Sequence, residues 1–398
     1  MASLFSPARR LAAAYAATFV TFGIHGPFFP IFLAGRGLTE AEIAIILAVP
    51  MLMRVGTAPL LGFISDLATE RRTVVAAYAF GAAIAFSAFG TATTFAAMVG
   101  LMILTALPWN GVTPGLDTIS LSMVRRGLVD YGAVRVWGSL GYVAANVAGG
   151  ILFARTGAEA VFLVLAGAFW LQATMILAAP AAGPRLAVPA EAGKGPSGFA
   201  DLLRSGPLMA VLVGIALVQS SHALQNGFAS LYWRSIGFGE AFIGTLWALG
   251  VSLEVFLFFL GTRLTARLGP HGLLILGGCG ALARWALYPV IEGRWAWAAV
   301  QVLHAFSFSA THLGTMVYIA RAAPDRLTGS AQGIAVTLTG LVMAIAMLSS
   351  GPLYGWLGVQ GFWVMAGLAA AGTAILVWQA LRAQPQRSGV GGRSVEPS

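Results

Sequence analysis

The sequence predicts an all-α membrane protein of twelve transmembrane helices, arranged as two pseudo-symmetric halves of six helices each. Three observations predict this fold class: the composition is strongly apolar, long apolar segments recur along the chain, and the two halves share a faint repeat. Of the 398 residues, 58% are hydrophobic and only 9% are charged. Soluble domains typically contain about 25% charged residues, so we expect the apolar segments of this chain to face lipid.

Twelve apolar segments are separated by turns that contain charged residues, Gly and Pro. A helix that crosses a bilayer needs about 20 mostly apolar residues, and each segment meets or approaches this length. The predicted spans are 9–34, 40–65, 72–92, 95–122, 136–156, 159–180, 207–233, 240–263, 271–291, 295–321, 329–355 and 359–382. The widest polar gap, 181–206, is rich in Pro and Gly and predicts a cytoplasmic linker between a first half, 1–180, and a second half, 207–382. We expect 383–398 to be a disordered cytoplasmic tail.

The basic residues indicate how the chain is oriented in the membrane. The net charge of +9 does not point to nucleic acid, because the basic residues occur singly or in pairs and form no stripe. Lys and Arg favour cytoplasmic loops. With the N-terminus inside, 17 of the 23 Lys and Arg residues fall on the cytoplasmic side, four fall outside, and Arg54 and Arg284 lie within spans. We therefore predict a multi-pass protein of the cell inner membrane with both termini in the cytoplasm.

The faint internal repeat has an offset of 200 residues. Residues 38–43 read LTEAEI and residues 238–243 read FGEAFI, so that Glu40 corresponds to Glu240. The same offset places Glu254 of the eighth span opposite Arg54 of the second span. Opposite charges are thus expected at equivalent depths of the two halves. Repeats of this kind, related by an axis along the membrane normal, are typical of transporters that bind substrate between the halves near the midplane.

Four ionisable residues lie within the predicted spans, namely Arg54, Asp117, Glu254 and Arg284. Each is expensive in a membrane, by at least about 2.5 kcal/mol, and such residues are functional candidates by default. The guanidinium of Arg54 has the shape to hold a substrate carboxylate; the alternative is an ion pair that holds the halves together. Glu254 is the preferred candidate for a proton carrier. Burial favours the protonated form of a carboxyl group, whereas a nearby arginine favours the ionised form. A substrate that competes for the arginine would therefore change the proton affinity of Glu254. The alternative for Glu254 is a fixed pair with Arg284.

Polar and aromatic side chains near these charges complete the predicted site. Within ALPWNGVTPGLD, Asn110 precedes Asp117 at helical spacing, and the prolines at 108 and 114 disturb the helix. His222 and Asn226 share a helix face with Gln219, as His304 shares one with Ser307 and Thr311. Histidine can relay protons near neutral pH. Aromatic residues such as Trp109 could form the apolar wall of a binding site.

The loop after the second predicted span reads GFISDLATERR. Together with the two six-span halves and the central linker, it resembles the major facilitator superfamily. Gly62, Asp66, Arg71 and Arg72 match the superfamily pattern in this loop, whereas Leu67 replaces the usual basic residue and Thr69 the usual glycine. The resemblance implies a conformational gate at this loop. The residues we assign to it are Gly62, Asp66, Arg71, Arg72 and Arg135.

A narrower resemblance lies in DYGAVRVWGSLGYVAANVAGG, residues 130–150. This segment is similar to the loop and fifth span of phenylpropionate-permease-like transporters, relatives of the galactoside/proton symporters. Galactoside symporters have a Glu, an Arg and a His on spans eight, nine and ten, and Glu254, Arg284 and His304 occur here in that order. Ser307 stands where those symporters have a further Glu. The resemblance implies proton-coupled uptake of a small organic solute, often an aromatic acid.

We therefore predict a secondary active transporter that works by alternating access, as a symporter of protons and a small aromatic carboxylate. Sugar or nucleoside symport and drug/proton antiport are the open alternatives. The predicted substrate-binding residues are Arg54, Arg284, His25, Trp109, Asn110, His222, Asn226 and His304, and the predicted proton-coupling residues are Glu254 and Asp117.

Signatures of enzymes are absent from the sequence. It contains no His-Glu-x-x-His, no Walker-type phosphate loop, no Gly-x-Ser-x-Gly and a single cysteine. We therefore expect no enzyme activity, no metal and no cofactor, and an ion gradient as the driving force. The expected partners are a small-molecule substrate and the lipid bilayer, without nucleic acid, and we expect a monomer.

Overall fold

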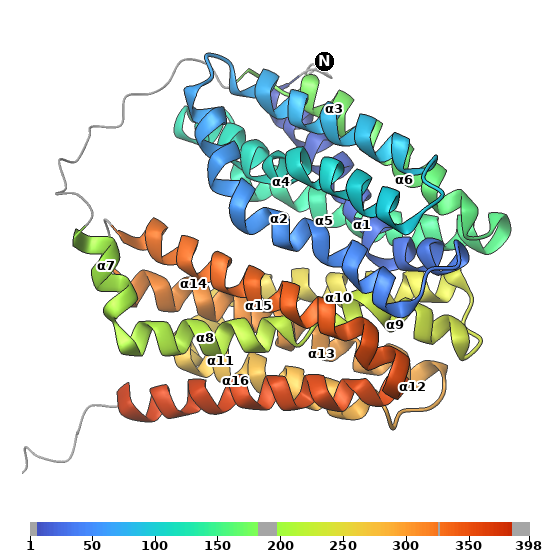
Figure 1. Ribbon diagram of the computed structural model, residues 1–398. Helices are drawn as coiled ribbons and strands as arrows, with labels where there is room; N and C mark the ends of the chain where they lie inside the picture. The colour runs from blue at the N-terminus through green and yellow to red at the C-terminus, as the bar shows by residue number, and fades with distance from the viewer. Residues whose placement is uncertain (1–5, 182–196, 325–326, 384–398) are drawn as a thin grey trace, which may run out of the picture.

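The computed structural model describes residues 6–181, 197–324 and 327–383. Within these ranges it contains helices joined by short turns and no β-strand (Figure 1). The helices are α1 (Pro7–Gly35), α2 (Glu40–Leu67), α3 (Arg71–Phe89), α4 (Phe95–Arg125), α5 (Tyr131–Thr156), α6 (Glu159–Leu177), α7 (Ser197–Arg204), α8 (Gly206–Ser220), α9 (Ala223–Ser235), α10 (Glu240–Phe259), α11 (Gly261–Leu287), α12 (Arg294–Val300), α13 (Val302–His304), the π-helix η1 (Ala305–Ala310), α14 (Thr311–Ala322), α15 (Thr328–Leu357), the 3-10 turn η3 (Gly358–Gln360) and α16 (Gly361–Ala383).

Several helices of the first half begin at a side chain that caps them. Thr39 and Glu42 form a reciprocal capping box at the start of α2. Thr94 accepts a hydrogen bond from the backbone of α4, and Asp130 does the same for α5. Each cap satisfies a backbone N–H that has no partner inside its helix. The polar residues between the apolar segments therefore fix where these helices begin.

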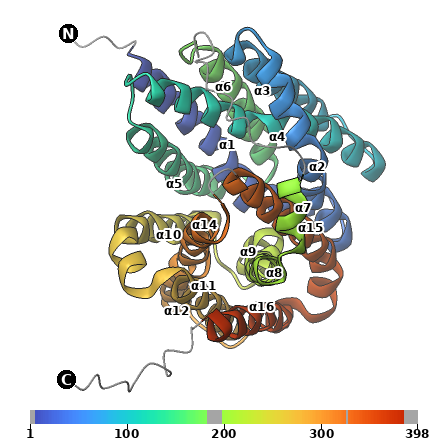
Figure 2. The same cartoon turned by 90° about the vertical axis from the view of Figure 1, so that its left-hand side faces the viewer.

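Helices α1–α6 form one half of the bundle and α8–α16 form the other (Figures 1 and 2). Helix α7 lies within the predicted linker 181–206, most of which is outside the described residues, as is all but the first residue of the predicted tail 383–398. The sequence predicted no regular structure at α7. Leu202 of α7 is buried, at 5% exposure. A short helix is stabilised mainly by packing of its apolar face, so this contact explains why a helix forms where the sequence predicted none.

The predicted repeat is visible in the helix boundaries. Helix α2 begins at Glu40 and α10 begins at Glu240, an offset of 200 residues. The helices before them end at Gly35 and Ser235, which gives the same offset. Arg54 and Glu254 consequently lie at the same distance along their helices, about 21 Å from the first residue at ~1.5 Å per residue.

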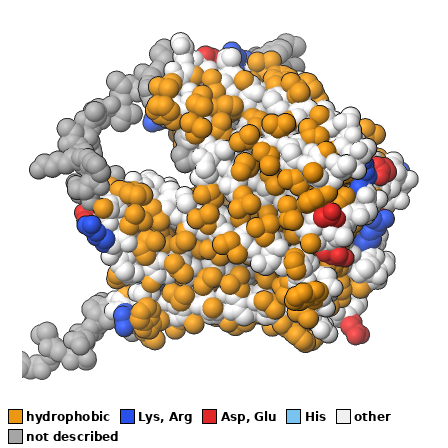
Figure 3. All heavy atoms as spheres, viewed as in Figure 1, with side chains coloured by type: hydrophobic (Ala, Val, Ile, Leu, Met, Phe, Trp, Pro, Cys, Tyr) orange, Lys and Arg blue, Asp and Glu red, His pale blue; other side chains and the backbone are white. Residues whose placement is uncertain are grey.

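The outer surface suits a lipid environment. Among the described residues, eight segments are long and apolar enough to cross a membrane. Each of the twelve predicted spans overlaps one helix or several consecutive helices, although the number twelve stays a prediction. In Figure 3 the broad middle of the molecule is largely hydrophobic, and charged side chains gather toward the two ends. Large apolar side chains such as Phe259 and Leu163, at 79% and 70% exposure, point outward.

Two predicted spans are interrupted rather than continuous, and one helix is kinked between two predicted spans. The predicted span 207–233 is split at residues 221–222 into α8 and α9, and the span 295–321 is split into α12, α13, η1 and α14. Helix α11 contains a kink at Gly269, whose φ of 63° is followed by Pro270. Glycine tolerates this left-handed conformation and proline cannot continue the hydrogen-bond ladder, which explains the kink. The apolar pattern alone does not reveal the first two breaks.

The two halves touch closely at one end of the bundle. Gly150 of α5 lies against the backbone of Glu240 on α10, so that a Cβ there would come within 2.5 Å of the carbonyl oxygen. Gly351 of α15 lies equally close to the backbone of Glu40 on α2. We call this the closed end. Toward the other end, near α7, the halves diverge and the surface is hollowed between them (Figures 1 and 3); we call it the open end.

Replacing Gly150 with Leu should loosen the closed end, because the new side chain would collide with the α10 backbone. In a Cys279→Ser background, Ala44→Cys would report the change, since Ala44 is fully buried where α2 meets α15. We expect a maleimide to react with this cysteine several-fold faster in the Gly150→Leu variant. The matched control is Gly167→Leu on α6, where a new Cβ would meet nothing within 4 Å. Equal rates in the two variants would contradict the proposed role of the α5–α10 contact.

Candidate functional site

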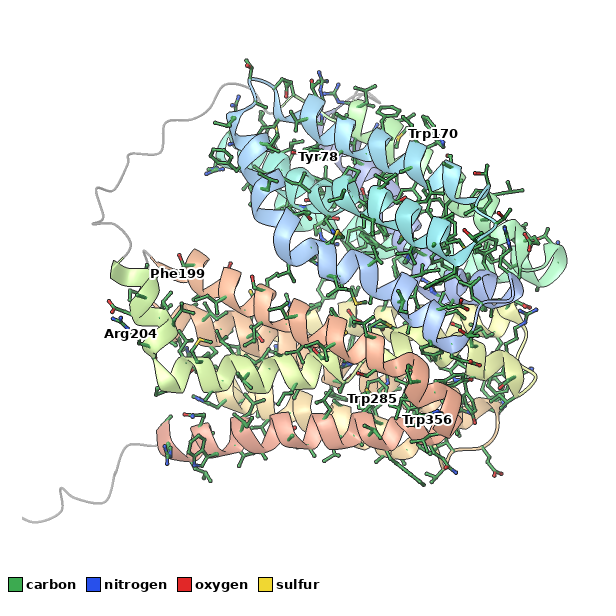
Figure 4. The ribbon with its side chains drawn as sticks, in the orientation of Figure 1. Tyr78, Trp170, Phe199, Arg204, Trp285 and Trp356 are labelled. Carbon is green, nitrogen blue, oxygen red and sulfur yellow. The ribbon has the colours of Figure 1, made fainter. Side chains whose placement is uncertain are left out.

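The most deeply buried charge in the second half is the guanidinium of Arg284, at 0% exposure on α11. Its Nη2 donates to Oε1 of Gln301 at 2.7 Å and to the hydroxyl of Tyr288 at 3.3 Å. Gln301 Nε2 in turn donates to the Tyr288 hydroxyl at 3.2 Å. The guanidinium also lies 4.8 Å from the ring centroid of Trp285, which Figure 4 labels inside the second half. Arg284 is therefore enclosed by neutral hydrogen-bond partners and aromatic rings.

His304 connects this arginine to a carboxylate. Arg284 Nη1 lies 2.6 Å from Nδ1 of His304, and His304 Nε2 lies 2.5 Å from Oε1 of Glu254. A guanidinium only donates hydrogen bonds, so Nδ1 must accept and the ring proton must be on Nε2. The imidazole then donates to Glu254 as a neutral bridge between a cation and an anion. We call Glu254, Arg284, Tyr288, Gln301 and His304 the Arg284 cluster.

Breaks in two helices bring the histidines of the second half together. His222 lies at the break between α8 and α9, and His304 is the last residue before the π-helix η1. The two rings are 5.9 Å apart, and His222 Nε2 lies 3.1 Å from the hydroxyl of Ser307. Gly250 of α10 makes room for His304, because a Cβ at 250 would come within 3.1 Å of its ring. Local π-helices and interrupted membrane helices are frequent at binding sites.

The first half presents an aromatic cluster rather than a charged one. Its members are Phe22, His25, Phe29, Trp109 and Phe169. The ring of His25 stacks on Phe29 at 4.9 Å and meets the edge of Trp109 at 5.2 Å. His25 Nε2 and Trp109 Nε1 are both buried without a hydrogen-bond partner among the described residues. Two polar nitrogens of this aromatic cluster are thus buried without a partner.

Arg54 is the predicted charge that the structure leaves free. Its side chain is exposed, and among the residues that the structure describes it forms neither a hydrogen bond nor an ion pair. One turn earlier on α2, the carbonyl of Pro50 accepts a hydrogen bond from Asn110 at 3.0 Å. Asn110 is the chain neighbour of Trp109, so Arg54 lies about one helical turn, ~5.4 Å of axial rise, from the point where α2 meets the aromatic cluster.

Asp117 belongs to a different group of residues at the open end. Its Oδ1 accepts hydrogen bonds from Tyr15 at 2.6 Å and from Tyr131 at 3.2 Å. These bonds tie α4 to α1 and α5. Arg135 of α5 lies 4.1 Å from the ring centroid of Phe19 and near Tyr15. Asp117 is thus joined to neither mid-helix arginine, and its predicted part in proton coupling stays a prediction.

The remaining predicted residues are distributed as follows. Asn226 is half-buried on α9 and has no side-chain hydrogen bond within the described ranges. Gly62 is exposed near the end of α2, and the side chain of Asp66 lies outside the described part of the chain. Arg72 donates to the carbonyl of Ala179 at 3.3 Å, which ties α3 to the end of the first half. Arg71 is likewise not without an interaction partner.

Two residues of the Arg284 cluster were missed by sequence reasoning. Tyr288 follows Arg284 by four residues on α11, and Gln301 precedes His304 by three residues. Both spacings place the side chains on one helix face, so the signal was present. The neutral polar residues predicted for the site, such as Asn110 and Asn226, lie on other spans, and neither Tyr288 nor Gln301 was among them. Thr311, expected on the same face as His304, packs against Gly277 of α11, the helix that also carries Arg284.

A resident metal has no evident site in the described ranges. They contain no group of three or more His, Cys, Asp or Glu residues placed to hold a metal ion. What the arrangement offers is a buried chain of proton donors and acceptors in one half. The first half offers the unpaired guanidinium of Arg54 and the buried aromatic cluster.

Comparison with known proteins identifies the class of molecule. Residues 8–365 match the model of the MFS_1 like family. The chain is 30% identical over 367 residues to the "Probable 3-phenylpropionic acid transporter" of Escherichia coli (strain K12), covering 91% of this chain and 95% of that protein. It is 26% identical to the "Maltose permease" of Geobacillus stearothermophilus over 80% of each chain.

Solved structures agree in fold. The crystal structure of the nucleoside transporter NupG superposes with a TM-score of 0.79 at 16% identity, covering 94% of this chain and 99% of that one. A bacterial homologue of the human lysosomal transporter Spinster, in an inward-facing conformation, gives a TM-score of 0.69 at 14% identity over 95% of each chain. The chain belongs to the MFS_1 like family and is a multi-pass membrane transporter of the major facilitator type, not an enzyme.

Proposed function

We propose that this transporter moves a small aromatic carboxylate together with protons, as a symporter. The observation that supports this most is the unpaired guanidinium of Arg54, one helical turn along α2 from the contact between Pro50 and Asn110, the chain neighbour of Trp109 in the aromatic cluster. A guanidinium holds a carboxylate through two parallel hydrogen bonds. An apolar wall with few placed polar groups suits an aromatic ring. The relative named for 3-phenylpropionic acid is consistent with such a substrate.

Arg54 would hold the carboxylate in the space between the halves. The next residue, Val55, packs against Gly340 of α15 across the interface between the halves. A Cβ added at Gly340 would lie 3.3 Å from a methyl group of Val55. A guanidinium turned toward lipid would cost about 2.5 kcal/mol or more. The side chain of Arg54 therefore favours the polar space between the halves. The ring of the substrate would then pack against the aromatic cluster once opening of the cluster exposes Trp109 and His25, whose nitrogens are buried without a partner in this structure.

Glu254 would carry the proton. In the Arg284 cluster its carboxylate is reached by His304, whose ring is held on the other side by Arg284. A proton that binds Glu254 removes the negative charge facing this chain, so the balance of charge between the halves changes when the proton arrives. With Arg54 at the same depth in the other half, proton and substrate would act on one central space. Rocking of the halves would then expose that space to either side.

The orientation follows from the distribution of Lys and Arg along the chain. Both termini would be cytoplasmic and the membrane would be the inner membrane of a bacterium. The open end would then face the cytoplasm, so the structure would represent an inward-open conformation. The protein would act as a monomer and need no cofactor.

Replacing Arg54 with Gln should weaken carboxylate transport selectively. Hydrogen bonds to a charged group are worth about 1.5–3 kcal/mol, so we expect the KM for 3-phenylpropionate to rise about 10- to 100-fold. Uptake of radiolabelled substrate into proteoliposomes measures this. Arg54→Lys keeps the charge but loses the two parallel hydrogen bonds, so its KM should lie between those of wild type and Arg54→Gln. If 3-phenylpropionate is not transported and maltose or a nucleoside is, the proposal of an acid substrate is wrong.

Replacing Glu254 with Gln should separate binding from coupling. A glutamine keeps a hydrogen-bond acceptor for His304 but cannot take up a proton, so accumulation driven by an imposed pH gradient should be lost. Exchange of substrate across the membrane without a gradient should persist, because it needs no net proton movement. Glu159→Gln, an exposed acid at the start of α6, is the matched control. Undiminished accumulation in Glu254→Gln would contradict the assignment of the proton carrier.

A further inference from the structure

A cavity lies away from the Arg284 cluster, at the open end of the second half. Its volume is about 800 Å³, and it is lined by the start of α8, the kinked middle of α11 and the ends of α14 and α16. Figure 2 looks onto this end and shows the four helices gathered around one another. No member of the Arg284 cluster lines it. Neither Arg54 nor Trp109 nor His25 lines it either, so the cavity is separate from the space in which we place the transported substrate.

Two arginines give this cavity a positive charge. Arg321 lies in the last turn of α14 and Arg382 in the last turn of α16, and both line the cavity. Neither forms a hydrogen bond or an ion pair with any residue that the structure describes. The guanidinium carbon of Arg382 lies 3.9 Å from the ring centroid of Trp378. Stacking on a ring does not use the N–H donors of the guanidinium, so they can still bind a ligand. The lining contains no Asp or Glu.

Neutral donors line the same space. Gln379 is 8% exposed and forms no side-chain hydrogen bond within the described ranges, yet its amide is not among the polar groups closed off from solvent. The amide of Gln379 is therefore accessible from the cavity and can donate to a ligand there. His271 lies next to Tyr318, with ring centroids 5.4 Å apart. Two free guanidiniums, an amide and an imidazole together suit the oxygens of a phosphate group.

The position of the cavity indicates where such a phosphate would come from. Leu381 and Trp378 are 63% and 47% exposed on the same turns of α16, and Leu268 is 43% exposed beside the kink of α11. The cavity thus opens where the apolar surface of the bundle meets its charged end. Tryptophan and arginine at this level of a membrane helix contact lipid headgroups. Basic pockets between membrane helices on the cytoplasmic side bind anionic headgroups.

We propose that this cavity binds the phosphate of an anionic phospholipid, held by Arg321 and Arg382 with Gln379 as a neutral donor. The acyl chains would lie along the exposed apolar side chains of α16 and α11. The lipid would bridge the last turns of α14 and α16, which belong to the same half. This site does not depend on the identity of the transported solute.

Native mass spectrometry of the full chain in detergent tests the proposal. Wild type and Arg321→Gln/Arg382→Gln would be titrated with phosphatidylglycerol and, separately, with phosphatidylcholine of the same acyl chains. We expect wild type to retain phosphatidylglycerol several-fold more strongly than phosphatidylcholine, and the double variant to lose this preference. Arg263→Gln/Arg267→Gln removes two exposed arginines from the same end of the same half and should keep it, because neither lines the cavity. Arg321→Lys/Arg382→Lys should restore part of it.

Two results would overturn the proposal. One is a double variant, still folded by circular dichroism, that prefers phosphatidylglycerol as strongly as wild type does. The other is displacement of the lipid from wild type by millimolar inorganic phosphate, since this would assign the cavity to a soluble anion instead. If inorganic phosphate leaves the bound lipid in place, the headgroup and its acyl chains are both needed for binding, as proposed.

Discussion

The burial of Arg284 is the constraint on which the arrangement of the second half depends. A charged guanidinium at 0% exposure inside a membrane bundle must be paired or hydrogen-bonded, because breaking such a buried pair costs about 3–5 kcal/mol. One partner, Tyr288, lies on its own helix. Two others, Gln301 and His304, are brought to it by the interrupted helices α12 and α13. The breaks in the tenth predicted span are therefore matched to the hydrogen-bonding needs of one residue.

The same constraint accounts for the difference between the two halves. Glu254 and Arg54 occupy equivalent depths of α10 and α2, yet their surroundings are unlike. Glu254 lies at the end of a chain of hydrogen bonds that begins at Gln301, whereas Arg54 has no partner in the described structure. A pseudo-symmetric scaffold thus combines a half in which charges are satisfied internally with a half in which one charge awaits a ligand. Such a division of tasks suits a transporter that couples a proton to a carboxylate.

Much of the fold was predictable from sequence, because hydropathy and turn residues report directly on lipid contact. The apolar segments overlap the observed helices, and the offset that relates Glu40 to Glu240 reappears in the starts of α2 and α10. The breaks at His222 and His304 were not predictable in this way. They depend on side-chain hydrogen bonds between helices that are distant in sequence, and an apolar helix that is interrupted has the same composition as one that is not.

The sequence predicted several residues of the candidate site, but not the hydrogen bonds that join them. Glu254 and Arg284 were weighed as a direct pair, whereas His304 lies between them and each ring nitrogen contacts one of them. Gln301 and Tyr288 were not considered, although spacing placed both on the appropriate faces. Asp117 was grouped with Asn110 by helical spacing, but the phenols of Tyr15 and Tyr131 bind it at the open end. Spacing within one helix cannot reveal such contacts between helices.

Proton binding that accompanies substrate binding tests the central claim most directly. Purified protein in lightly buffered detergent would be mixed with 3-phenylpropionate at a series of pH values around neutrality, and a pH indicator would report protons taken up. If Glu254 carries the coupled proton, wild type takes up close to one proton per substrate bound at the pH where the carboxyl group is otherwise ionised. The Glu254→Gln variant then binds substrate without any uptake. Equal proton uptake by wild type and Glu254→Gln would contradict the account and assign the proton to another group.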